Sequence, residues 1–128
     1  MNEKIYKLED IKVWQEARVL RNLVYKTTTG YPADEKYNTV KHMRACSRNI
    51  PANIAEGFGR FHYQESTQFY RIARGSLAEL RSDIYCSFDS KYISNDIFNA
   101  ILDQVDKVGM LLNGFIKSAI KVRDRTSN

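Results

Sequence analysis

The sequence predicts an all-α protein, an antiparallel up-and-down bundle of four long helices whose second helix is kinked at Pro51. Apolar residues recur every three or four positions over four segments, which is the period of an amphipathic helix. The links between these segments are short, so neighbouring helices run antiparallel. No segment alternates polar and apolar residues with period two, as a half-buried strand would.

Length and composition are those of one globular domain. The chain has 128 residues, of which 43% are hydrophobic and 27% charged, and we expect residues 1–128 to form a single domain. No run approaches the roughly 18 apolar residues that a membrane span requires, and the first residues lack the apolar stretch of a signal peptide. We therefore expect a cytoplasmic protein that does not contact membranes, with Cys46 and Cys86 as buried free thiols.

The first helix is expected over residues 8–28, with Trp14 among its core positions. Gly30 and Pro32 should end it, because glycine permits a left-handed cap and proline cannot continue the helical hydrogen bonds.

The second helix is expected over residues 34–58, with Asp34 as its N-cap. Pro51 lies inside this segment and removes one helical hydrogen bond. The apolar period continues through the proline, so we predict a kink in one helix and not a break between two. The stretch from Gly57 to Arg60 should be its C-terminal end.

The third and fourth helices are expected over residues 63–89 and 95–122. Gly75 and Ser76 place small residues in the middle of the third helix, where they would permit close helix contact. Ser94 is a suitable N-cap for the fourth helix.

The positive charge is confined to one part of the chain. The formal net charge is +5, and residues 36–81 contain eight basic and three acidic residues, which accounts for the whole excess. Localised positive charge favours an anionic partner more than uniform positive charge does.

Two groups of side chains carry this charge. Lys41, Arg44 and Arg48 fall on one side of the second helix, away from its apolar side; an anionic partner, a solvated face and a subunit contact all remain open for them. On the third helix, Tyr70, Arg74, Arg81 and Tyr85 share one stripe. Arginine and tyrosine side chains together on one stripe are typical of a protein interface and also of a nucleic-acid surface.

We predict that the protein binds nucleic acid, RNA before DNA, through a basic face of the second and third helices. The alternative is a protein-interaction scaffold or accessory subunit with no direct nucleic-acid binding. The residues predicted to contact nucleic acid are Lys41, Arg44, Arg48, Arg60, Arg71, Arg74 and Arg81.

We predict no catalytic residues. Glu56 and Glu79 could be interpreted as an acid/base pair, but no nucleophile with an adjacent base accompanies them. The sequence from Gly57 to Arg60 lacks the preceding strand and the lysine of a phosphate-binding loop. An enzyme is therefore not expected.

A metal site and a cofactor are not predicted either. His42 and Cys46 are spaced i, i+4 and could supply half of a zinc site. A closed site needs about four ligands, and the remaining candidates of these residue types are His62 and Cys86. We interpret the pair as a partly exposed histidine beside a core thiol.

Four separated blocks resemble one family. They are residues 8–17, 50–60, 69–80 and 112–117, which contain LEDIKVWQEA, IPANIAEGFGR, FYRIARGSLAEL and LNGFIK. The chain resembles, over about residues 8–120, the bacterial four-helix bundle family of 23S rRNA intervening sequences. The resemblance implies a homo-oligomer, typically a pentamer, with a basic surface and no enzymatic activity. It extends to an accessory protein of diversity-generating retroelements that partners a reverse transcriptase and binds nucleic acid.

The resemblance also picks out polar positions and three departures. An oligomer interface or a structural polar network is expected for the polar positions Asn53, Glu56, Ser76 and Glu79, and also for Tyr70 and Tyr85 of the third-helix stripe. Ser66 and Thr67 stand where similar proteins often carry apolar residues, and Lys91 stands where a glycine is common.

Overall fold

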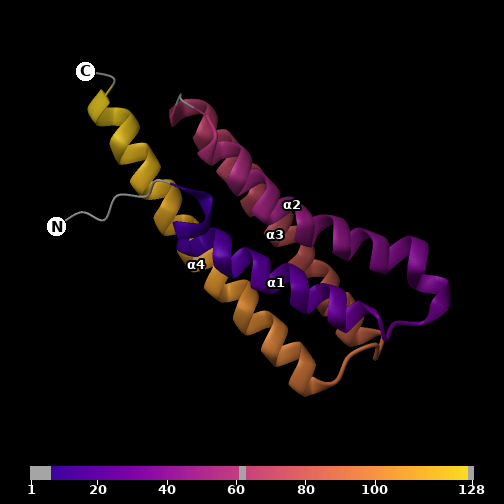
Figure 1. The fold of residues 1–128 in the computed structure, drawn as a ribbon. Helices are drawn as coiled ribbons and strands as arrows, with labels where there is room; N and C mark the ends of the chain where they lie inside the picture. The colour runs from indigo at the N-terminus through magenta and orange to yellow at the C-terminus, as the bar shows by residue number, and fades with distance from the viewer. Residues whose placement is uncertain (1–6, 61–62, 127–128) are drawn as a thin grey trace.

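The computed structural model describes residues 7–60 and 63–126, and they form an antiparallel four-helix bundle (Figure 1). The predicted fold class is therefore confirmed. None of the helices within these two ranges is both long and apolar enough to cross a lipid bilayer. The helices are α1 Lys12–Thr28, α2 Lys41–Phe58, α3 Tyr63–Asp89 and α4 Asn95–Thr126.

Each helix packs against the next one along the chain, and α4 returns to pack against α1. The contact between α2 and α3 is the most extensive of the four. All four helices contribute fully buried apolar side chains to one core, each of which stabilises the fold by about 1.5–3 kcal/mol. The largest are Leu20, Met43, Ile50, Ile54, Leu80, Ile84, Ile101 and Leu112.

The first helix ends at Thr28 as predicted, but its start and its C-terminal cap differ from the prediction. It begins with a separate 3-10 turn, η1 Leu8–Asp10, before α1 starts. No glycine in the described ranges has a positive φ, so the left-handed cap expected at Gly30 was wrong. The hydroxyl groups of Thr28 and Thr29 instead donate to the carbonyls of Val24 and Tyr25, at 2.8 and 2.9 Å. Trp14 is partly buried against the core, as predicted.

The start of the second helix was also predicted wrongly. Asp34 does not cap it but lies inside a 3-10 turn, η2 Ala33–Glu35, which leads into a π-helical turn, η3 Lys36–Val40, and then into α2. The side chain of Glu35 accepts hydrogen bonds from the side chains of Asn38 and Thr39, which links the two turns.

Pro51 lies inside a continuous α2, as the sequence predicted. Figure 1 shows that α2 changes direction in its middle part. The helix then ends at Phe58, followed by Gly59, whose N–H donates to the carbonyl of Ala55 at 3.1 Å. The predicted helix terminus at Gly57 to Arg60 is confirmed.

Close approach of α2 and α3 occurs at Gly57 and not at Gly75. A Cβ atom added to Gly57 would lie 2.4 Å from Cε1 of Tyr70, whereas one added to Gly75 would meet nothing within 4 Å. Gly75 is exposed, so the expected close helix contact there was wrong within the chain. Ser66 is buried beside this contact and its hydroxyl donates to the carbonyl of Gly57 at 2.7 Å.

The turn between α3 and α4 explains the third departure. Lys91 has a φ of 63°, in the left-handed region that glycine adopts at little cost. A glycine at this position in similar proteins therefore has a backbone reason. Ser94 caps α4 as predicted, because its hydroxyl accepts the N–H of Ile97 at 3.2 Å.

Candidate functional site

The seven predicted basic residues do not lie on one face. Arg44 turns toward α1, where its Nε donates to the hydroxyl of Thr28 at 3.0 Å. Arg81 turns toward α4 and pairs with Asp106 at 2.6 Å. Because α1 and α4 flank the α2–α3 pair on its two sides, these arginines point in different directions.

The other five predicted basic residues also lie in different surroundings. Arg74 also turns toward α4, where its Nη1 donates to the side chain of Asn113 at 3.3 Å. Arg60 pairs with Glu56 at 2.5 Å along α2. The remaining three, Lys41, Arg48 and Arg71, are exposed.

A basic face that the sequence analysis missed lies between α1 and α2. Trp14, Arg18, Arg21 and Tyr25 are spaced by 4, 3 and 4 residues and so share one stripe of α1. The guanidinium of Arg18 lies 5.4 Å from the ring centroid of Trp14, and that of Arg21 lies 3.6 Å from the ring centroid of Tyr25. The ring of Tyr25 also contacts Arg44 of α2, with 4.7 Å to its centroid.

We call this surface the α1–α2 basic face. It combines two arginines of α1 with the basic side of α2 that the sequence predicted. The helical spacing of Arg18 and Arg21 beside two aromatic residues was the signal that could have revealed it. Its residues are Arg18, Arg21, Lys41, Arg44 and Arg48.

Acidic residues do not neutralise this face. The sequences of α1 and α2 contain two of them, Glu16 and Glu56, and each is paired elsewhere. Glu16 accepts a hydrogen bond from Gln104 at 3.0 Å and forms an ion pair with Lys107 at 3.2 Å. Both partners lie on α4. The Gln104 bond, followed by the nearby lysines, lowers the pKa of Glu16 to about 2 against the opposing effect of burial.

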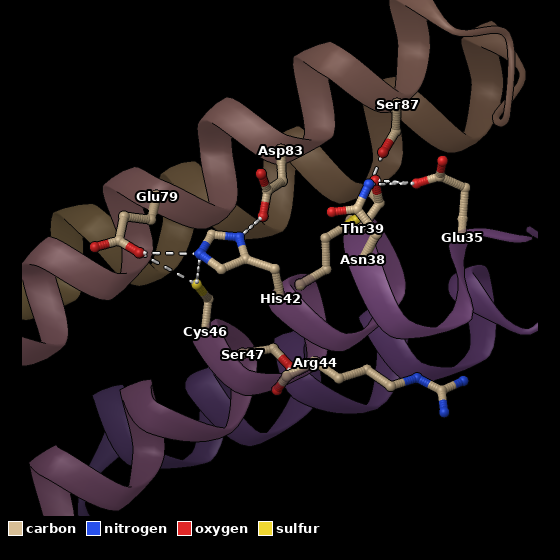
Figure 2. A network of polar contacts seen from close by, with 11 residues as sticks. Glu35, Asn38, Thr39, His42, Arg44, Cys46, Ser47, Glu79, Asp83 and Ser87 are labelled. Atoms are coloured by element: carbon tan, nitrogen blue, oxygen red, sulfur yellow. Dashed lines mark hydrogen bonds and ion pairs between the residues drawn. The ribbon is translucent and has the colours of Figure 1, made fainter.

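A second group of polar side chains lies between α2 and α3, on the other side of α2 (Figure 2). We call it the α2–α3 polar cluster; it consists of His42 and Cys46 from α2 and Glu79 and Asp83 from α3. Nδ1 of His42 contacts the carboxylate of Asp83, and Nε2 lies 3.3 Å from the carboxylate of Glu79. Figure 2 shows Arg44 pointing away from this cluster.

Burial and the neighbouring carboxylates set the protonation of the cluster. Burial, with the negative charges of Glu79 and Asp83, raises the pKa of the Cys46 thiol to about 12. The thiol is therefore uncharged at neutral pH and is not an activated nucleophile. The hydrogen bond to Asp83 is the main cause of the raised pKa of His42.

The cluster brings together residues that the sequence analysis placed in separate groups. His42 and Cys46 were expected to be a partly exposed histidine beside a core thiol, without Glu79 and Asp83. Two i, i+4 pairs on consecutive helices were the available signal. Of the other potential ligands, Cys86 is an exposed free thiol outside the cluster, which corrects its predicted burial. His62 lies outside the described residues.

The residues of the expected polar network do not form one network and lie in separate places. Tyr70 is only 4% exposed and packs edge-on against Phe115, so it belongs to the core. Asn53 donates to the carbonyl of Asn49 within α2. Tyr85 is 45% exposed and contacts Phe98 of α4. Ser76 is half-buried on α3. A role of these residues between subunits stays a prediction.

The protein is thus an all-α four-helix bundle that carries the α1–α2 basic face and the α2–α3 polar cluster. The profile of the 23S rRNA-intervening sequence protein family matches residues 9–114, and the chain belongs to this family. A crystal structure described as a protein with unknown function from the S23 ribosomal protein family of Bacteroides thetaiotaomicron VPI-5482 has the same fold. Its TM-score is 0.74 at 18% identity, over 82% of this chain and 98% of that one. No curated protein matches the sequence.

Proposed function

We propose that this protein binds nucleic acid, RNA in particular, through the α1–α2 basic face. The observation that carries the proposal is the meeting of five cations and two aromatic rings on one face, while both acids of these helices are paired elsewhere. Cations on such a face neutralise phosphates and release counterions, which is the main source of nucleic-acid affinity.

The arrangement of these side chains suits contact with a phosphate backbone. Lys41 and Arg48 are exposed, so their head groups can reach phosphates. Arg21 and Arg44 are held against the ring of Tyr25, and immobilised side chains lose less entropy on binding. Trp14 and Tyr25 hold three arginines of this face in place through cation–π contacts.

The proposal keeps three of the seven residues that the sequence predicted and replaces the rest. Arg60 and Arg81 are paired with carboxylates, which reduces what they can contribute to an anionic ligand. Arg71 is exposed on α3 and is not part of the face. RNA as the ligand agrees with the family description, which refers to 23S rRNA intervening sequences.

A homo-oligomer, a pentamer in particular, is part of the proposal. The family resemblance implies this state, and a subunit contact could cover Val19, Ile72 or Met110, which are 49%, 51% and 71% exposed. Light scattering of the purified protein should then give five times the 14.9 kDa of one chain. A monomer would contradict this part of the proposal.

The binding test compares two triple charge reversals. Fluorescence anisotropy is measured with a labelled RNA hairpin, a single-stranded RNA and a DNA of the same sequence. Combining Arg18→Glu, Lys41→Glu and Arg48→Glu should weaken binding by about tenfold or more. The matched control combines Arg71→Glu, Lys117→Glu and Lys121→Glu, three exposed cations outside the face, and should bind nearly as the wild type does.

Two outcomes would contradict the proposal. Equal losses in both triple variants would mean that only the net charge matters. Absence of binding by the wild type at low salt would favour the alternative, a protein-interaction scaffold or an accessory subunit of an enzyme such as a reverse transcriptase. A partner that still co-purifies after nuclease treatment would be the evidence for that alternative.

A further inference from the structure

Three potential metal ligands of different chemistry converge in the α2–α3 polar cluster. They are Nε2 of His42, Sγ of Cys46 and Oε2 of Glu79, which all lie within 4.8 Å of one another. In Figure 2 the imidazole ring lies between Glu79 and Asp83, with the sulfur of Cys46 beside Nε2. The ligands come from the two helices with the most extensive contact in the bundle.

The separations of these atoms match one face of a zinc tetrahedron. Zinc bonds of about 2.0–2.1 Å to nitrogen and oxygen and about 2.3 Å to sulfur place nitrogen and oxygen about 3.3 Å apart, and sulfur about 3.5–3.6 Å from each. The observed separations are 3.3 Å from His42 Nε2 to Glu79, 3.7 Å from His42 Nε2 to Cys46, and 3.6 Å from Cys46 to Glu79. Little rearrangement is therefore needed to bind the ion.

Asp83 supplies the outer support that metal-binding histidines usually have. Its carboxylate contacts Nδ1 of His42, which holds the ring and directs Nε2 toward Cys46 and Glu79. A carboxylate on the far nitrogen of a ligating histidine fixes its tautomer and raises its basicity. Three of the four residues in the cluster can therefore act as ligands, namely His42, Cys46 and Glu79. The fourth, Asp83, orients His42.

We propose that His42, Cys46 and Glu79 bind a zinc-class divalent cation, with Asp83 as the positioning residue for His42. Imidazole with thiolate selects zinc and related transition metals over magnesium and calcium, which prefer oxygen ligands. The side chains of His42 and Glu79 are 51% and 64% exposed, so the ion enters from solvent and water occupies its fourth position. The thiol proton of Cys46 passes to solvent when the sulfur coordinates.

The test uses Co²⁺ as a spectroscopic replacement for Zn²⁺ in the metal-free, untagged protein. Binding should produce the thiolate-to-cobalt charge-transfer band, and added Zn²⁺ should displace it and raise the melting temperature. Cys46→Ser should abolish the band, whereas Cys86→Ser, which changes the chain's other cysteine, should retain it. His42→Gln should weaken zinc binding, and His62→Gln is its matched control.

Two further variants separate ligation from folding. The side chain of Glu79 is largely exposed, so Glu79→Gln should fold normally and still lose at least tenfold in zinc affinity. Asp83→Asn should keep the charge-transfer band and lose about 10- to 100-fold in affinity. Far-ultraviolet circular dichroism of the metal-free Cys46→Ser variant checks that its helices form.

The proposal is wrong if the wild type gives no charge-transfer band with Co²⁺. It is equally wrong if the band persists in Cys46→Ser and disappears in Cys86→Ser, or if Glu79→Gln binds zinc as tightly as the wild type.

Discussion

Arg44 of α2 lies against Tyr25 of α1, with its guanidinium 4.7 Å from the ring centroid and its Nη2 donating to the Tyr25 carbonyl at 3.3 Å. The same side chain donates through Nε to the buried hydroxyl of Thr28. One arginine therefore joins α2 to the C-terminal end of α1 while its charge remains on the α1–α2 basic face. The structural contacts of Arg44 and its proposed role in binding are separated by comparing it with its exposed neighbour Arg48.

Arg44→Ala should lower the free energy of unfolding by about 1–2 kcal/mol, because it removes two hydrogen bonds and a cation–π contact. Urea denaturation followed by circular dichroism measures the change. Arg48→Ala alters an exposed side chain one turn further along α2 and should stay within about 0.5 kcal/mol of wild type. Equal losses in the two variants would mean that the contacts of Arg44 contribute nothing particular to stability.

Alanine at Gly57 and at Gly75 should have opposite effects. Gly57→Ala places a methyl group 2.4 Å from the buried ring of Tyr70, and overpacking of this kind costs about 1–3 kcal/mol. Gly75→Ala meets nothing within 4 Å in the middle of α3 and should stabilise the protein by about 1 kcal/mol. Thermal unfolding of both variants checks the pair. Destabilisation by Gly75→Ala would contradict this prediction, because it would mean that the added methyl group meets another part of the protein.

Glu16 should make stability depend on pH in the acid range. Its pKa falls from 4.5 to about 2 on folding, so its contribution is complete above pH 4.5 and is lost as the pH falls toward 2. The loss should amount to about 3 kcal/mol for this carboxylate, whose side chain is 12% exposed. Urea denaturation of wild type and Glu16→Gln across this range should show a flatter dependence in the variant. Gln104→Ala should show a smaller flattening, and parallel curves would contradict the assignment.

Lys91→Gly should stabilise the turn between α3 and α4. Lys91 has a φ of 63°, and a side chain in this region costs about 1 kcal/mol relative to glycine, partly offset by the greater freedom of glycine in the unfolded chain. We expect a gain of about 0.5 kcal/mol in chemical denaturation. Ser90→Gly, in the same turn without a positive φ, should destabilise the protein. A loss of stability in Lys91→Gly would show that the lysine side chain matters more than its backbone.

Apolar spacing was sufficient to predict the helices because burial repeats regularly along each of them. The continuity of α2 through Pro51 and the cap at Ser94 followed from local chemistry. The cap of the first helix and the start of the second helix could not be predicted in this way. The structure uses threonine hydroxyls instead of Gly30 at the first and a π-helical turn after Asp34 at the second. Several local solutions compete at a helix end, and tertiary packing selects among them.

The candidate sites depended on which side of a helix meets which neighbour. Arg44 and Arg81 both belong to the basic third of the sequence, yet one turns to α1 and the other to α4. Cys46 and Glu79 are 33 residues apart and meet only because α2 and α3 pack in this register. Helical spacing within one segment contains neither fact, so the sequence identified the charge but not which of its residues share a face.

The salt dependence of RNA binding tests the central claim most directly. The logarithm of the association constant should fall linearly with the logarithm of the salt concentration, and each phosphate contact contributes about 0.7–0.9 to the slope. Combining Lys41→Gln with Arg48→Gln should reduce the slope by about 1.4–1.8, and combining Arg71→Gln with Lys117→Gln should leave it unchanged. A slope that drops equally in both double variants, or in neither, would contradict binding through the α1–α2 basic face.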